Sequence, residues 1–146
     1  MRPLYETAAD LDNESSIATM LERKWDCSFV KLPIRYHLDF VVTRGDKAVA
    51  YAEFKTRNYS MADIDKMGGY LMSIGKWSAA KQLCDASLLP FILVVKTLDG
   101  LYRSSFTEFV PDDVLVRGRT DRNDWQDIEP CVLLNTQRFK RINLGN

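Results

Sequence analysis

The residues best suited to chemistry are two acids and a lysine, Asp39, Glu53 and Lys55, in the stretch DFVVTRGDKAVAYAEFK. Carboxylates that lie side by side repel each other unless a positive charge lies between them. Their oxygens are the ligands that Mg²⁺ and Mn²⁺ prefer in proteins. If the fold brings Asp39 and Glu53 together, this stretch predicts a site for a divalent cation beside a lysine.

A β-hairpin is the element that would bring the two acids together. The apolar runs FVVT and AVAYA lie on either side of the polar turn RGDK, which is a typical hairpin pattern. Folded about Asp46, the hairpin places Asp39 opposite Glu53. Side chains two positions apart in a strand share a face, so we expect Lys55 beside Glu53.

A third acid, Glu14, falls within a helix predicted from about residue 12 to residue 24, which Asp12 or Asn13 can cap. At about 100° per residue, Glu14 lies in the apolar arc formed by Ile17, Ala18, Leu21 and Trp25. Two interpretations stay open. Either Glu14 faces the core because it is paired or metal-bound, or it lies in the exposed first turn and favours the helix dipole.

The remaining elements predict a mixed β-sheet with helices packed against it. Strand patterns occupy about residues 27–32, 91–96, 101–105, 114–116 and 131–134. The run FILVVK is continuous and apolar, as a buried central strand would be. A long helix is predicted over about residues 61–86, with Ser60 as its cap and a weak point or bend at Gly68-Gly69.

Composition bounds the class of protein. The 146 residues fit one domain. Twenty basic and twenty acidic residues give a net charge of zero, so any surface that binds nucleic acid must be local. No stretch approaches the roughly 20 apolar residues of a membrane helix, and the three cysteines lack the spacing of a zinc or disulfide framework. We therefore expect an intracellular, cytoplasmic protein with free thiols and no membrane partner.

The order of elements and the acid pattern resemble the PD-(D/E)XK nuclease superfamily, whose core runs helix, three strands with a hairpin, helix, strand. The chain looks like the small phage type. The resemblance implies a restriction-endonuclease-like α/β fold with a central mixed sheet flanked by helices. It also implies a single domain over residues 1–146, with a core at about 12–105 and a C-terminal extension at 106–146.

Residue by residue, Asp39 matches the first acid of the motif, and Glu53 and Lys55 match its E-x-K. Glu14 matches the acid that many members carry on the first helix. Leu38 stands where the motif has proline, a position at which the superfamily is lax.

The resemblance implies metal-dependent hydrolysis of DNA phosphodiester bonds, in which Lys55 positions the water or stabilises the transition state. The Mg²⁺ or Mn²⁺ ligands would be Glu14, Asp39, Glu53 and the backbone carbonyl of Phe54. The long helix often lends a polar residue to the site, and the candidates are Tyr70, Ser73 and Lys76. Candidate contacts to the DNA backbone are Lys31, Arg35, Arg57 and Lys66.

Three alternatives stay open. The acids can belong to a solvent-facing strand pair, salt-bridged to Lys55 or Arg57. The protein can be a Holliday-junction resolvase, which would act on branched DNA as a homodimer. It can also be an inactive nuclease fold kept as a DNA- or protein-binding regulator. The intact acid–acid–lysine set argues against the last, because binding alone gives no reason to place carboxylates beside phosphate.

Overall fold

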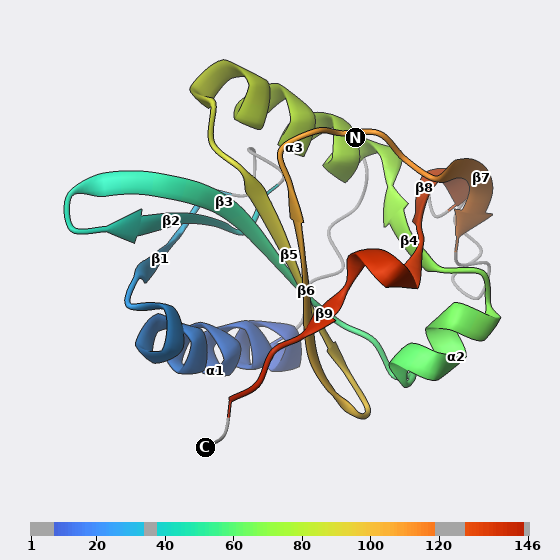
Figure 1. Ribbon diagram of the computed structural model, residues 1–146, viewed down its shortest axis with the longest axis horizontal. Helices are drawn as coiled ribbons and strands as arrows, with labels where there is room; N and C mark the ends of the chain where they lie inside the picture. The colour runs from blue at the N-terminus through green and yellow to red at the C-terminus, as the bar shows by residue number, and fades with distance from the viewer. Residues whose placement is uncertain (1–7, 34–37, 119–127, 145–146) are drawn as a thin grey trace.

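The computed structural model describes residues 8–33, 38–118 and 128–144, which form a mixed six-stranded sheet and a smaller three-stranded sheet (Figure 1). In spatial order the large sheet contains β1 (Ser28–Lys31), β2 (Phe40–Arg44), β3 (Lys47–Thr56), β5 (Phe91–Thr97), β6 (Gly100–Phe106) and β9 (Lys140–Arg141). The small sheet contains β4 (Tyr70–Ser73), β8 (Ile128–Leu134) and β7 (Asp113–Gly118). The helices are α1 (Ala8–Trp25), α2 (Met61–Lys66), α3 (Ile74–Ser87) and the 3-10 helix η3 (Thr136–Arg138).

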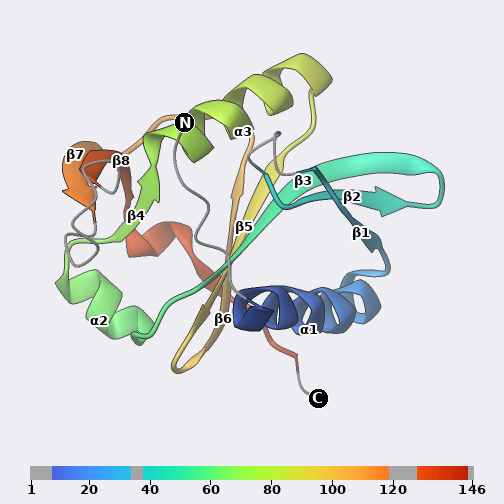
Figure 2. The same cartoon turned by 180° about the vertical axis from the view of Figure 1, so that it is seen from behind.

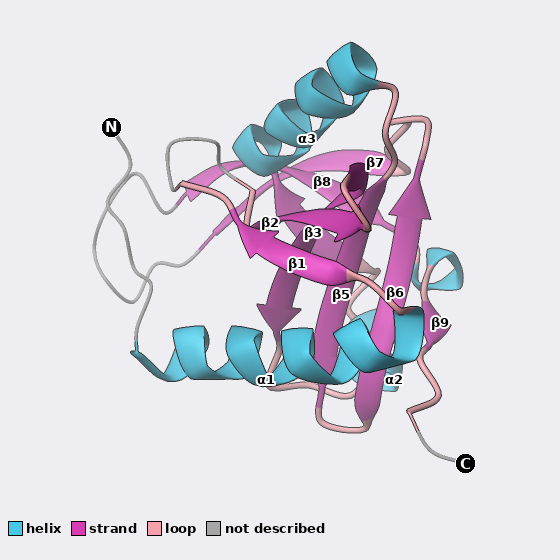
Figure 3. Cartoon of the chain, turned by 90° about the vertical axis from the view of Figure 1, so that its left-hand side faces the viewer, coloured by secondary structure: helices cyan, strands magenta, loops and turns pink. Residues whose placement is uncertain are grey.

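Helices cover both faces of the large sheet, with α1 on one face and α3 on the other (Figure 3). The central strand β5 serves both layers, because its side chains alternate between the faces. Val94 joins Ile17 and Leu21 of α1 in one buried cluster, whereas Leu93 and Val95 join the cluster under α3. The predicted α/β fold, with a mixed sheet flanked by helices, is confirmed.

A β-bulge sets the register of the β2–β3 hairpin. The turn at Gly45-Asp46 pairs Arg44 with Lys47 and Thr43 with Ala48. If this pairing continued without a bulge, Asp39 would lie opposite the residue before Glu53. One extra residue on β3 corrects this offset, and the antiparallel pairing reaches Phe40 opposite Ala52. Asp39 is the next residue along, so it faces Glu53 as the sequence predicted, although the bulge was not foreseen.

The predicted helix over residues 61–86 is wrong, because this segment forms α2, β4 and α3 in turn. Gly68 and Gly69 adopt φ values of 103° and 134°, which end α2. A side chain at Gly69 would bring its Cβ within 2.6 Å of the Leu134 carbonyl oxygen. The following strand β4 pairs with β8, about 60 residues further along the chain. This long-range pairing overrides the local preference for helix.

The predicted start of the first helix is also wrong. The helix begins at Ala8, so Asp12 and Asn13 lie inside it and not at its N-cap. Ala8 and Ala9 are strong helix formers and extend the helix by a turn. The prediction for the next helix holds, because the Ser60 hydroxyl caps α2 by accepting from the Asp63 N–H at 3.1 Å.

Residues beyond 105 complete both sheets. In Figure 2 the small sheet lies beside the start of α3, where β8 pairs with both β4 and β7. Val132, Leu134 and Phe139 are buried in the cluster under α3, and Ile142 is buried in the cluster under α1. The C-terminal segment therefore contributes to both hydrophobic clusters.

Two smaller predictions bear on the class of protein. Cys27, Cys84 and Cys131 form no disulfide with one another, as their spacing predicted. Among the described residues, no helix combines the length and apolar character needed to cross a membrane.

Candidate active site

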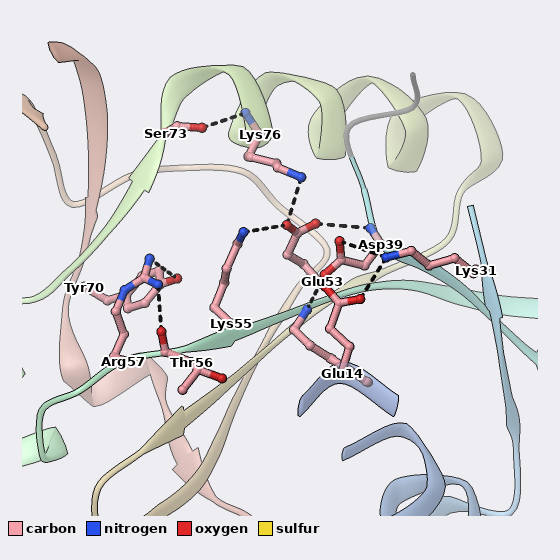
Figure 4. A network of polar contacts seen from close by, with 11 residues as sticks. Glu14, Lys31, Asp39, Glu53, Lys55, Thr56, Arg57, Tyr70, Ser73 and Lys76 are labelled. Carbon is pink, nitrogen blue, oxygen red and sulfur yellow. Dashed lines mark hydrogen bonds and ion pairs between the residues drawn. The ribbon is translucent and has the colours of Figure 1, made fainter. Parts of the chain in front are cut away.

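Two acidic side chains lie side by side where β2 begins and β3 passes it (Figure 4). The Asp39 N–H donates to Glu53 Oε2 at 3.2 Å, and the Phe54 N–H donates to Asp39 Oδ2 at 3.0 Å. The Asp39 carbonyl accepts from the Leu32 N–H at 2.8 Å, which ties this residue to the end of β1. Glu53 is only 1% exposed and Asp39 is 9% exposed. The alternative of a solvent-facing strand pair is therefore wrong as to exposure, although the ion pair of Glu53 with Lys55 that it included is present.

Two lysines point at Glu53 from different elements (Figure 4). Lys76 Nζ of α3 lies 2.9 Å from Glu53 Oε1, and Lys55 Nζ of β3 lies 3.5 Å from the same atom. Lys55 lies beside Glu53 as the strand period predicted. Lys76 reaches the acid because it lies in the first turn of α3, which packs over this face of the sheet.

Burial and charge set the protonation of these groups. Burial raises the pKa of Glu53 above its ordinary value, and the nearby charge of Asp39 raises it further, against the opposing effect of Lys76 and Lys55. Burial acts to lower the pKa of Lys55, but the charges of Glu53, Tyr70 and Asp39 outweigh it, so this pKa is raised. Lys55 is therefore a cation at neutral pH and cannot act as a general base in this state.

A third lysine, Lys31, joins Glu14 to the acid pair. Lys31 Nζ lies 2.8 Å from Glu14 Oε2 and 3.8 Å from Asp39 Oδ1. Glu14 thus faces inward from α1, which agrees with its helical phase and with the interpretation that it is a paired acid. The sequence indicated Lys31 only as a DNA contact. Lys31 lies near Asp39 because it pairs with Phe40, the residue after Asp39, in the β1–β2 ladder. The sequence alone does not show which residues of β1 and β2 pair, so it could not place Lys31 beside this acid.

The other predicted supporting residues have local roles. The Ser73 hydroxyl accepts from the Lys76 N–H at 3.2 Å and caps α3. Tyr70 is a buried residue of β4, and its hydroxyl accepts from Arg57 Nη2 at 3.0 Å. Neither residue lies on the long helix that the sequence predicted. In Figure 4, Tyr70 and Arg57 face each other and lie apart from Glu53.

The predicted DNA contacts lie in different places. Lys31 lies in the site, between Glu14 and Asp39, whereas Arg57 contacts Tyr70 and lies apart from Glu53. Lys66 is exposed in the last turn of α2. Arg35 lies outside the described residues.

The acid pair fits a hard divalent cation by its oxygen donors. Glu53 Oε1 is buried, and its close contacts are the ammonium groups of Lys76 at 2.9 Å and Lys55 at 3.5 Å. In an extended strand the N–H and C=O of one residue point to the same edge. The Phe54 carbonyl therefore points toward Asp39, as its N–H does. Across the part of the chain with described positions, however, no three acidic, cysteine or histidine side chains group closely enough to hold an ion.

A buried acid pair with an E-x-K lysine, on a mixed sheet between two helices, defines a member of the PD-(D/E)XK nuclease superfamily. The model of the family described as "Phage putative PDDEXK endonuclease" matches residues 1–142, and the chain belongs to this family. A comparison with curated proteins finds no match. The family name supports a nuclease, a hydrolase of phosphodiester bonds.

Proposed function

We propose that this protein is an Mg²⁺- or Mn²⁺-dependent endonuclease that hydrolyses DNA phosphodiester bonds inside the cell. The observation that supports this most is the buried Glu53 carboxylate beside Asp39, whose pKa is raised by burial and by Asp39 although two lysines approach it. Burying a charged group without full compensation costs free energy. A divalent cation held by the two acids would compensate their charge and remove that cost. The burial of the pair is therefore consistent with a role in binding a catalytic metal ion.

Each residue of the site would have a separate role in this reaction. Asp39, Glu53 and the Phe54 carbonyl would hold the ion. When bound, such an ion polarises the scissile phosphate and lowers the pKa of water. Lys55, kept cationic by Glu53, would position the attacking water or stabilise the charge that develops on the phosphate. Lys76 approaches the same oxygen of Glu53 from α3 and would bind the scissile phosphate.

The positive groups around the acids would supply local affinity for DNA despite the net charge of zero. The side chains of Lys31, Lys55 and Lys76 are 42%, 38% and 29% exposed, so each is accessible to a phosphate. Arg57 lies 5.0 Å from the centre of the Tyr70 ring, which holds its guanidinium near the end of β3. We keep Lys31, Arg57, Lys66 and Arg35 as proposed DNA contacts.

A cleavage assay with plasmid DNA in Mg²⁺, Mn²⁺ or EDTA tests the proposal. We expect cleavage with either ion and none in EDTA. Lys55→Ala should abolish cleavage while the protein stays folded by circular dichroism. Lys47→Ala is the matched control, because this exposed lysine starts the same strand, and it should cleave normally. Cleavage in EDTA, or full activity of Lys55→Ala, would contradict the mechanism.

The same assay with different DNA forms separates the alternatives. Preference for four-way junctions over linear duplex and single strands, together with a dimer by light scattering, would identify a resolvase. Failure to cleave any DNA, with no Mn²⁺ binding by calorimetry either alone or with DNA, would favour the inactive regulator.

A further inference from the structure

Lys31 occupies the space between two largely buried acids. Its ammonium lies 2.8 Å from Glu14 and 3.8 Å from Asp39, and these side chains are only 13% and 11% exposed. Several contacts hold the lysine there. Its backbone pairs with Phe40 in the β1–β2 ladder, and its Nζ lies 5.1 Å from the centre of the Phe40 ring, within the range of a cation–π contact.

The position of this ammonium is incompatible with an ion shared by Glu14 and Asp39. A cation bound by both carboxylates would lie between them, where Lys31 Nζ already lies. Two positive charges a few ångströms apart repel strongly in a partly buried site. The acid pair of Asp39 and Glu53 is arranged differently, because no ion pair among the described residues joins one lysine to both of these acids. Lys76 and Lys55 pair with Glu53 Oε1, whereas Lys31 pairs with Asp39 and Glu14.

We propose that Lys31 is a built-in cation that fills the space between Glu14 and Asp39 and thereby limits the protein to one divalent ion. In this arrangement Glu14 is a positioning residue, which holds Lys31 through an ion pair, and Asp39 and Glu53 hold the single ion. The inference rests on the proposed metal-dependent function and deepens it, since it assigns the number of ions and the residue that sets it.

Isothermal titration of the full chain with Mn²⁺ in the absence of DNA tests this stoichiometry without relying on activity. Wild type should bind one ion per chain. Lys31→Met should bind a second ion, because it leaves Glu14 and Asp39 without their shared cation. Lys31→Arg keeps the charge and should return the stoichiometry to one. Lys47→Met changes the net charge equally at an exposed position on β3 and should also bind one ion.

Glu14→Gln provides a test that does not depend on the folding of Lys31→Met. Since Glu14 is not a ligand of the single ion, Glu14→Gln should keep one site with an affinity within about threefold of wild type. The double variant Glu14→Gln/Lys31→Met should lose the second ion gained by Lys31→Met. Two ions in wild type, one ion in Lys31→Met, or loss of the ion in Glu14→Gln would each overturn the inference. Absence of Mn²⁺ binding to wild type, even with DNA, would instead overturn the proposed function and this inference with it.

Discussion

Glu53 is held in an environment that disfavours its charge. Its pKa is raised by burial and by Asp39, even though two lysines approach it. A carboxyl group whose pKa is higher in the folded than in the unfolded protein binds its proton more tightly when folded. Folding stability therefore falls as the pH rises from the ordinary glutamate value of 4.5 through the raised pKa. The ionised Glu53 therefore lowers the free energy of unfolding at neutral pH.

We predict that Glu53→Gln raises the melting temperature at pH 7 and abolishes cleavage. Each kcal/mol gained corresponds to about 2–4 °C for a chain of this size. The gain should shrink as the pH is lowered and vanish below 4.5, where wild-type Glu53 is protonated in both the folded and the unfolded state. Cleavage should fall by more than about 100-fold, because even outer-shell partners of a metal contribute about 10–100-fold. Thermal unfolding in EDTA across pH, beside the plasmid assay, measures both effects. A lower melting temperature at pH 7 would contradict the assignment of an unfavourable charge.

For individual residues, the sequence was most informative about those that the β2–β3 hairpin brings together. The strand period placed Glu53 and Lys55 on one face, and the turn position placed Asp39 near them, although the bulge on β3 sets the final register. Lys31 could not be placed, because its neighbours come from α1 and β2. Ion pairs between separate elements have no periodic signal in the sequence.

Among the secondary-structure elements, α3 links its own N-cap to the acid pair, because the capped residue also contacts Glu53. The Ser73 hydroxyl caps this helix through the N–H of Lys76, the residue whose ammonium contacts Glu53. The Ser60 hydroxyl caps α2 in the same way, and the ion pairs described for Asp39 and Glu53 come from Lys31, Lys55 and Lys76, which lie outside α2. The two serines therefore allow stability and site geometry to be separated.

We predict that Ser73→Ala and Ser60→Ala each lower the free energy of unfolding by about 1 kcal/mol, the usual effect of losing an N-cap. Only Ser73→Ala should also slow cleavage, by about fivefold, the rate equivalent of about 1 kcal/mol, because fraying of this turn displaces Lys76. Urea unfolding and initial cleavage rates at a temperature where both variants are folded give the comparison. Equal rates in the two variants would show that the cap of α3 has no part in catalysis.

Element prediction succeeded where pattern and pairing are local, as in the hairpin and the β5–β6 pair. It failed over residues 61–86, where α2, β4 and α3 were merged into one helix. The strand β4 forms because β8 pairs with it, and β8 lies about 60 residues further along the chain. Helical periodicity cannot report such a partner, because it describes only near neighbours in sequence.

At the scale of the whole molecule, a net charge of zero restricts DNA binding to a local surface. Lys55 and Lys76 lie on the face covered by α3, around the acid pair, and both are partly exposed. Binding should therefore depend on a few phosphate contacts and be sensitive to salt.

We predict that the DNA affinity, measured by fluorescence anisotropy in EDTA to prevent cleavage, falls linearly with salt on logarithmic axes. Each neutralised phosphate contributes about −0.9 to the slope for duplex DNA. Lys76→Ala should therefore make the slope shallower by about 0.9, whereas Lys47→Ala, at the far end of β3, should leave it unchanged. Equal slopes in wild type and Lys76→Ala would place DNA elsewhere on the molecule.

By itself the sequence determined the α/β class, the hairpin and the shared face of Glu53 and Lys55, because these follow from short-range periodicity and turn chemistry. Asp39 was predicted to face Glu53, but the bulge on β3 is what brings the two acids opposite each other. Only the tertiary structure decided that the acid pair is buried, that Lys76 of α3 reaches Glu53, and that Lys31 lies between Glu14 and Asp39. It also divided residues 61–86 among three elements. The physical reason is the same in each case. Burial, long-range strand pairing and the charge around an ionisable group depend on residues far apart in the chain, which meet only when the sheet and its helices assemble.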